Sequence, residues 1–248
     1  MKLMNFRPIN YIYGPNQSGK VIPLVLIALA AAAVGYFTFK SQMGDKGDTA
    51  SASSSHTQST NADNASLAAV QENLQTSLAL PIDFKTVKEF DLLDVNGELI
   101  KQDVFDDQWS MVFFGFTHCP DICPITLQIM KDVVAQLKEQ SQQELQIVFV
   151  SVDPARDTPE IMKQYISYFD EKFIGITGDV NEVHSLTSSL GIVASFTAND
   201  TDPDNYGVDH TASLLLIDPQ RRVRAKVSPP LEADKIVADV LTITAAPS

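Results

Sequence analysis

The two cysteines of this 248-residue chain, Cys119 and Cys123, are the residues whose type and spacing could do chemistry. Paired thiolates are soft ligands for Cu(I) or Zn(II), and a close pair of thiols can also exchange with disulfides. Four residues turn an α-helix by about 400°, so side chains at this spacing share one helix face. If the helix begins only at Asp121, Cys119 lies just outside it and the geometry is looser. Because two cysteines cannot build a disulfide scaffold, the pair indicates redox or metal chemistry.

The sequence around the cysteines predicts the place where a buried strand ends and a helix begins. An apolar run over residues 109–116 predicts the strand, and apolar residues at spacings of three and four over 130–137 predict the helix. Pro120 and Pro124 fit the start of a helix, because its first turn makes no intrahelical N–H bonds. The helix dipole and the free backbone N–H groups there should favour a thiolate.

A metal would need a third ligand, which we sought among the four histidines. His210 is the best candidate, because it lies just before the apolar run 213–217. That run predicts a central strand, whose leading loop should open at the sheet edge where the cysteines lie. His118 adjoins the first cysteine, but an extended backbone turns its side chain to the other side. His184 lies on the polar side of a predicted helix and His56 in a polar segment, so we expect both to be solvated.

The segment from Thr197 to Asp209 is long, acidic and polar, so we expect a mobile loop with His210 at its end. Three aspartates alternate within it like the start of a calcium-binding loop. A calcium loop needs glycine at its sixth position and glutamate at its twelfth, and this segment has neither. We therefore interpret these residues as a solvated acidic loop; they are Asp200, Asp202 and Asp204.

The order of the apolar patterns predicts an α/β sandwich with a mixed central sheet flanked by helices. Expected strands cover residues 90–93, 98–100, 109–116, 145–152, 173–176, 213–217 and 222–227, and further helices lie near 159–169, 183–190 and 231–241. The chain carries 18 basic and 31 acidic residues, a net charge of −13. This charge argues against nucleic-acid binding, which needs a basic surface.

The N-terminal part of the chain predicts a membrane anchor over residues 21–39. This segment holds no charge and would span about 28 Å as a helix, close to the thickness of a bilayer core. A cleaved signal peptide is the competing interpretation, with small residues at 28–33 as the cleavage site. Residues 1–20 carry three basic side chains and no acid, which predicts that they stay in the cytoplasm. Since this leader is not Arg-rich, we expect a single-pass protein of a bacterial inner membrane with its C-terminal domain in the periplasm.

The segment 41–80 is rich in small polar residues and predicts a flexible tether between the anchor and a folded domain over 81–248. Within this tether, residues 67–80 have some apolar spacing and could form a short helix.

Three motifs of this chain resemble motifs of the Sco/SenC family and follow one another in the order that the family has. They are Gly115 to Pro124, Ser151 to Pro159, and Tyr206 to His210. Members of this family are membrane-anchored, thioredoxin-like copper proteins of cytochrome c oxidase assembly, and the similarity covers about residues 81–244. The resemblance implies a thioredoxin-like fold with Cys119, Cys123 and His210 as ligands of Cu(I) or Cu(II).

The resemblance also implies partners and a role for the second motif. Copper would be delivered to the dinuclear CuA site of cytochrome c oxidase subunit II, with another copper chaperone as a candidate donor. Asp153 and Arg156 would support the site and the docking of the partner; the equal alternative is a turn followed by a helix cap.

Two other activities compete with copper delivery. One is a thiol–disulfide oxidoreductase that reduces the cysteines of the CuA site, and the other is a peroxiredoxin-like enzyme. Thioredoxin-type reductants use a Cys-x-x-Cys pair that is one residue shorter than the pair here. The extra residue and a histidine within reach favour a metal, so we expect a metallochaperone rather than an enzyme.

Overall fold

The computed structural model describes residues 66–141, 143–198 and 206–246. The predicted segments 1–20, 21–39 and 41–65 lie outside these residues, as do His56 and the three alternating aspartates. Within the described part of the chain, no helix combines the length and apolarity that crossing a bilayer requires.

An eight-stranded mixed sheet forms the centre of the described domain, in the order β1-β10-β9-β4-β5-β6-β2-β3. The strands are β1 Ser77–Ala79, β2 Leu92–Asp94, β3 Leu99–Ile100, β4 Ser110–Gly115, β5 Gln146–Ser151, β6 Ile174–Thr177, β9 Leu214–Ile217 and β10 Val223–Val227. Strands β4, β5 and β6 run parallel, and the other neighbours pair antiparallel. The expected mixed α/β architecture is therefore confirmed.

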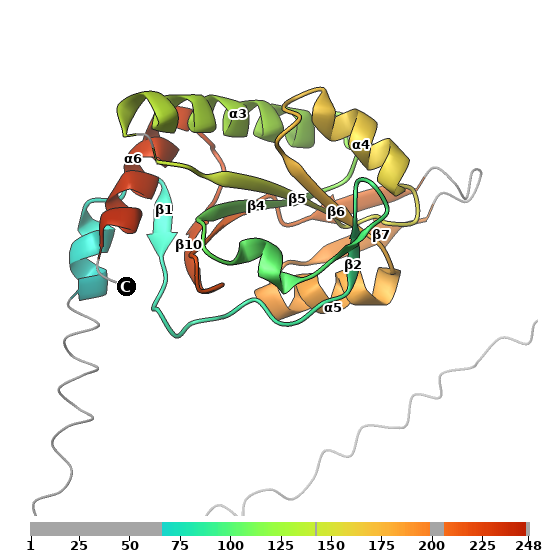
Figure 1. Cartoon of the computed structure of the whole chain (residues 1–248), viewed down its shortest axis with the longest axis horizontal. Coiled ribbons are helices and arrows are strands. Elements are labelled where there is room, and N and C mark those ends of the chain that lie inside the picture. The colour runs from blue at the N-terminus through green and yellow to red at the C-terminus, as the bar shows by residue number, and fades with distance from the viewer. Residues whose placement is uncertain (1–65, 142, 199–205, 247–248) are drawn as a thin grey trace, which may run out of the picture. The chain divides into compact units, whose positions relative to one another are not determined.

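Helices cover both faces of this sheet (Figure 1). They are α3 Ile122–Gln140, α4 Pro159–Ser167, α5 Val180–Leu190 and α6 Ala233–Ala245, with a short 3-10 helix η1 at Gln102–Phe105. Helices α3 and α4 lie over one face and α5 over the other, and α6 packs against α3. Every residue of β4 is buried, and so is every residue of β5 except the first. This is why both strands read as continuous apolar runs in the sequence.

Local signals set the helix ends near the site. Helix α4 begins after Thr158, whose side chain accepts a hydrogen bond from the Ile161 N–H, with proline in its first turn. Helix α5 ends at Gly191, which has a φ of 77° that glycine adopts without strain. Met162 and Ile166 form the buried stripe of α4, and Ile161 lies beside this stripe with 39% of its surface exposed.

The folded domain begins earlier than the predicted tether allows. Residues 66–72 are helical, and β1 pairs with β10 at the edge of the sheet. The buried carboxylate of Asp239 in α6 accepts three backbone N–H bonds of 2.6, 2.9 and 2.7 Å, from Gln75, Thr76 and Ser77. The tether prediction is therefore wrong for residues 66–80, and the short helix predicted over 67–80 stops at 72. The cause is a contact across more than 160 residues, which local composition does not show.

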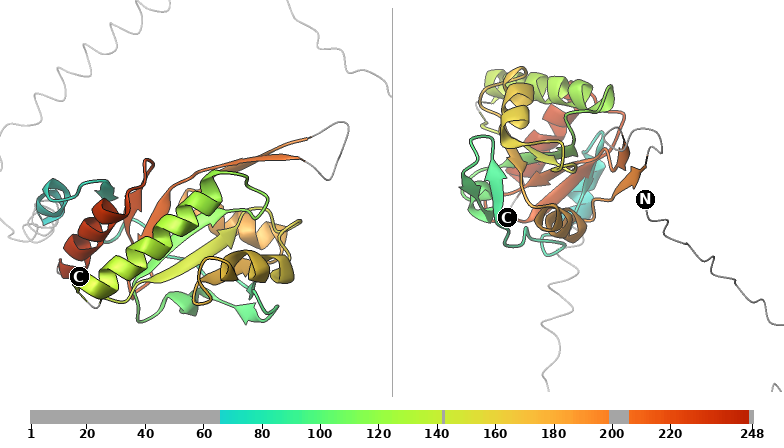
Figure 2. Two further views of the ribbon diagram at one scale, coloured as in Figure 1. Left: turned by 90° about the horizontal axis from the view of Figure 1, so that it is seen from above. Right: turned by 90° about the vertical axis from the view of Figure 1, so that its right-hand side faces the viewer.

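A separate two-stranded ladder carries His210. It consists of β7, Ala194–Thr197, and β8, Gly207–His210, which pair antiparallel so that Ala194 faces His210. Figure 2 shows this hairpin extending away from the body of the domain. The predicted loop over 197–209 is thus wrong for Thr197, which ends β7, and for residues 207–209, which belong to β8; His210 ends β8.

Candidate metal centre

The cysteine segment links the end of β4 to the start of α3. The Cys119 N–H donates to the Phe116 carbonyl at 3.2 Å, which closes a turn after the strand. Helix α3 begins at Ile122, with Asp121 as its N-cap. Cys123 is therefore the second helical residue and Cys119 lies outside the helix, which is the looser of the two predicted geometries. Pro124 falls in the first helical turn, as predicted.

Both sulfurs are enclosed by the domain. Cys123 has no exposed surface, and Cys119 is 9% exposed. A Cβ on Gly115 would lie 2.8 Å from Cys123 Sγ and 2.8 Å from Phe149 Cε2. The absence of a side chain at Gly115 therefore lets the start of α3 lie directly against the end of β4.

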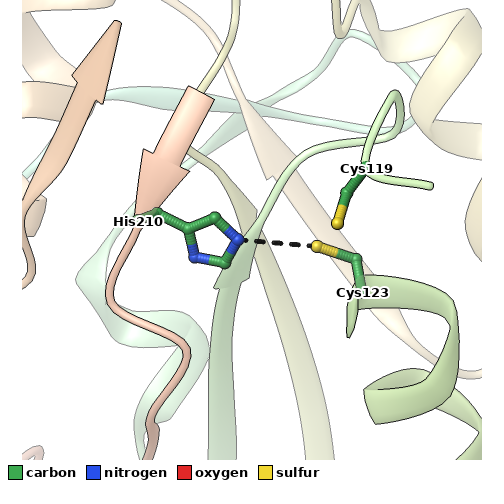
Figure 3. Close-up of side chains that lie close together, drawn as sticks. All are labelled: Cys119, Cys123 and His210. Carbon is green, nitrogen blue, oxygen red and sulfur yellow. Dashed lines mark hydrogen bonds between the residues drawn. The ribbon is translucent and has the colours of Figure 1, made fainter. Parts of the chain in front are cut away.

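His210 completes a group of three potential ligands. Its Nε2 atom lies 3.6 Å from Cys123 Sγ, and the donor atoms of Cys119, Cys123 and His210 lie within 4.8 Å of one another (Figure 3). Strand β9, which follows His210, pairs antiparallel with β4, so its start lies beside the end of β4 that leads to the cysteines. The structure thus brings together the three residues that the sequence singled out.

The surroundings of His210 select one neutral form of its ring. Nδ1 lies 3.3 Å from the carbonyl oxygen of Thr211, which can only accept a hydrogen bond. Nδ1 therefore carries the proton, and the lone pair of Nε2 faces Cys123. The Phe113 and Phe116 rings pack edge-on against the imidazole, with centroids 6.2 and 5.8 Å away. Burial lowers the pKa of His210, although the bond to Thr211 opposes the shift, so the ring is held in the form that binds metals.

Burial also raises the pKa of Cys123, against the opposing effect of a backbone hydrogen bond at Phe116. For Cys123 this opposes the expectation that the helix start favours a thiolate, because loss of water around the sulfur disfavours its negative charge. In the metal-free protein Cys123 is a thiol, and its S–H group can donate to His210 Nε2, 3.6 Å away. A metal that binds there must displace this proton.

Asp157 fixes the chain just before the cysteines. Its buried carboxylate accepts the Thr117 N–H at 3.0 Å, the Thr117 hydroxyl at 2.6 Å and the Ser151 hydroxyl at 2.6 Å. His118 lies half-exposed beside Thr117, with Nδ1 3.1 Å from its hydroxyl oxygen, outside the three-ligand group. His184 is exposed on α5, also as expected.

Asp153 and Arg156 make contacts that neither predicted role describes in full. The backbone of Asp153 does form the predicted turn, because its carbonyl accepts the N–H groups of residues 156 and 157. Its side chain, however, is buried and accepts bonds from Arg156 and from the hydroxyl of Tyr206. Burial and the bond to Asp153 raise the pKa of Tyr206 to about 12, so its hydroxyl remains a donor. The sequence alone assigns Tyr206 no role, since its contact with Asp153 spans 53 positions and leaves no local signal.

Comparison with known proteins relates this arrangement to a family. Residues 81–245 match the SCO1/SenC family. A Stutzerimonas stutzeri protein, described as a candidate copper-binding protein, is 37% identical over 157 residues that cover 63% of this chain and 76% of that relative. The SCO2-like protein RP587 of Rickettsia prowazekii is 38% identical over 133 residues that cover 54% of this chain and 64% of that relative.

The fold of this chain also resembles that of solved structures of Sco proteins. The crystal structure of Arabidopsis thaliana ScoI with copper bound matches with a TM-score of 0.61 and 30% identity, over 64% of this chain and 98% of that one. Residues 81–245, which match the family, contain the cysteine pair, Asp153, Tyr206 and His210. The expected thioredoxin-like fold is confirmed, and the chain belongs to the SCO1/SenC family.

Proposed function

We propose that this protein is a membrane-anchored copper metallochaperone that holds copper with Cys119, Cys123 and His210. The observation that carries the proposal is the half-buried, neutral imidazole whose Nε2 lies 3.6 Å from Cys123 Sγ. Two sulfurs and one imidazole nitrogen suit Cu(I) and also Cu(II), whereas structural zinc sites have four protein ligands. The relatives support this choice of metal, since one is described as copper-binding and another was solved with copper bound.

The same geometry suits a carrier. Cys123 is fully buried, whereas Cys119 is 9% exposed and His210 is half-buried, so the ligands of a partner would approach the metal from the side of Cys119 and His210. A site with three ligands leaves a coordination position through which copper can be passed on. The proposed acceptor is the CuA site of cytochrome c oxidase subunit II; membership of the SCO1/SenC family supports it, since a matched structure is described as a member of the Sco family of cytochrome c oxidase assembly proteins.

Thiol–disulfide exchange is the second candidate function. Both cysteines are free thiols with sulfurs within 4.8 Å of each other, so they could reduce the cysteines of the CuA site. Exchange requires a thiolate and no histidine, and the raised pKa of Cys123 disfavours the thiolate. The imidazole beside the pair therefore favours metal binding.

The proposed location is a bacterial inner membrane, with the domain in the periplasm. It rests on the uncharged segment 21–39 and on the basic residues before it. A periplasm-dependent reporter fused after Ser248 should be active, and activity of a cytoplasm-dependent reporter at that position would refute the location.

Oxidase assembly in cells tests the function itself. A strain that lacks this protein would receive the wild type, His210→Ala or the matched control His184→Ala, whose side chain is exposed on α5. At limiting copper we expect oxidase activity with the wild type and the control, and none with His210→Ala. Full activity with His210→Ala would refute copper delivery and favour thiol reduction, which needs only the cysteines.

A further inference from the structure

The side chain of Tyr206 joins the β7–β8 hairpin to the loop that follows β5. Its hydroxyl donates a 2.5 Å hydrogen bond to Asp153 Oδ1. The guanidinium carbon of Arg156 lies 3.8 Å from the centre of the Tyr206 ring, and Arg156 Nη1 donates to the Tyr206 carbonyl oxygen at 3.2 Å. Arg156 Nε in turn donates to Asp153 Oδ2. Tyr206 is therefore held through its hydroxyl, its ring and its main chain.

The hairpin needs such an anchor. Its two strands pair with each other and with no strand of the main sheet in the described part of the chain. Three of the four residues of β7 and two of the four of β8 are exposed, and an isolated two-stranded ribbon is marginally stable in water. Near its base, the Thr211 N–H donates to the Val193 carbonyl at 3.0 Å. Tyr206 provides the attachment at the opposite end of β8, where its ring also meets Phe196 of β7.

Two connections run from Tyr206 to His210. One is the backbone of β8, which begins directly after Tyr206 and ends at His210. The other is a layer of side chains: the guanidinium carbon of Arg156 lies 5.9 Å from the centre of the Phe116 ring, and that ring meets His210 edge-on at 5.8 Å. A shift of Tyr206 would therefore move both the strand that carries His210 and the packing around its imidazole.

We infer that Tyr206 is a positioning residue, which holds β8 against the Asp153–Arg156 pair and so keeps His210 Nε2 within reach of the two cysteines. The inference rests on the proposed copper-binding function, but the positioning itself is a property of the metal-free chain. The Asp153–Arg156 pair would then hold β8, the strand that carries the nitrogen ligand His210.

The metal-free protein tests the positioning directly. Amide hydrogen exchange would be followed at residues 208–210 in the wild type, Tyr206→Phe and Tyr206→Ala. Tyr168→Ala is the matched control, because that tyrosine is 84% exposed at the end of α4. We expect loss of protection in Tyr206→Ala, partial loss in Tyr206→Phe and none in the control, with protection of β4 and β5 unchanged in all three. Full protection of residues 208–210 in Tyr206→Ala would overturn the inference.

Copper binding then tests whether the effect passes through His210. Substitutions behind a metal ligand typically lower affinity about 10- to 100-fold, so Tyr206→Ala should weaken Cu(II) binding by at least about tenfold. In a His210→Ala background the same substitution should change Cu(II) affinity by less than about twofold, because the ligand it positions is gone. Tyr206→Phe retains the ring and should lie between the wild type and Tyr206→Ala, which keeps the test valid if the alanine variant folds poorly.

The outcomes separate this inference from the proposed function. If the wild type binds no copper, the proposed function fails, and hydrogen exchange alone decides the positioning. If His210→Ala weakens copper binding and Tyr206→Ala does not, the function stands and the inference fails. An equal loss from Tyr206→Ala with and without His210 also overturns it, since the tyrosine would then act on the whole fold rather than on the ligand.

Discussion

Cys123 Sγ lies 3.6 Å from His210 Nε2, although 87 positions separate the two residues in the chain. Cys123 belongs to the first turn of helix α3. His210 lies at the base of the β7–β8 hairpin, which projects from the domain (Figure 2). The site is therefore assembled from one part in the core and one part outside the main sheet.

Copper uptake should release protons. Because burial raises the pKa of Cys123, its thiol is protonated at neutral pH in the metal-free protein, and a bound copper ion must displace that proton. Burial lowers the pKa of His210, so its imidazole is already neutral at pH 7 and contributes no proton. Titration calorimetry in buffers of different ionisation enthalpy should show at least about one proton released per copper bound near pH 7.

The protons on Cys123 and His210 determine how copper affinity changes with pH. Copper affinity should rise with pH across the neutral range, since fewer protons then compete for the sulfur. In acid it should fall more steeply once the pH approaches the lowered pKa of His210, below the usual value of 6.5. Affinity that stays constant between pH 6 and 8 would contradict a protonated Cys123.

Replacing either cysteine by serine should abolish tight Cu(I) binding, but the two variants should differ in stability. Cys123 has no exposed surface, and the shorter C–O bond leaves a serine hydroxyl farther from His210 Nε2 than the sulfur is. Burying that hydroxyl without a partner should lower the free energy of unfolding by about 1–3 kcal/mol. Cys119 keeps 9% of its surface exposed to water, so Cys119→Ser should cost less. Urea unfolding measures the free energy of unfolding of both variants. Equal values would contradict the prediction that burial makes Cys123→Ser the more costly substitution.

Gly115→Ala should disturb the site without changing any ligand. The added methyl group would lie 2.8 Å from Cys123 Sγ and 2.8 Å from Phe149 Cε2 in a fully buried position. Overpacking of this kind costs about 1–3 kcal/mol, and it should also reduce copper affinity by displacing the sulfur. Gly207→Ala is the matched control, because its methyl group would meet no atom closer than 3.7 Å. If the two alanine variants bind copper equally well, the close approach of Cys123 to Gly115 is not needed for copper binding.

Asp157→Asn should loosen the segment before the cysteines. The carboxylate accepts three hydrogen bonds from Thr117 and Ser151, and an amide group cannot accept all of them at both of its ends. A buried donor left without a partner costs about 1–3 kcal/mol, so the free energy of unfolding should fall by that amount. The control is Asp132→Asn on the exposed face of α3. Thermal unfolding that is identical for the two variants would show that Asp157 does not hold the segment.

Much of the fold was predictable because its signals are local. The continuous apolar runs of β4 and β5 follow from burial on both faces, and Gly191 ends α5 through its own backbone conformation. The turn between β2 and β3 contains an Asn-Gly pair, which is typical of hairpins, and Gly97 has a φ of 78° there. His210 was within reach of sequence reasoning because the strand after it was expected beside the strand that leads to the cysteines.

The features that were missed depend on distant contacts or on burial. Strand β1 was not expected because its neighbouring N–H groups are satisfied by Asp239, which lies more than 160 residues away. The raised pKa of Cys123 reflects the depth of the sulfur, which the spacing of two cysteines does not reveal. The role inferred for Tyr206 required its contacts with Asp153 and Arg156, which only the folded chain brings to it.

The central claim is that Cys119, Cys123 and His210 form one copper site, and copper analysis with an optical spectrum tests it most directly. The purified, reduced protein would be loaded with copper beside His210→Ala, and disulfide-reductase activity would be measured on both. The wild type should bind one copper per chain and show thiolate-to-Cu(II) charge-transfer absorption. His210→Ala should bind Cu(II) more weakly with an altered spectrum, while its reductase activity is unchanged. A wild type that binds no copper, or a His210→Ala variant with the same affinity and spectrum as the wild type, would contradict the account.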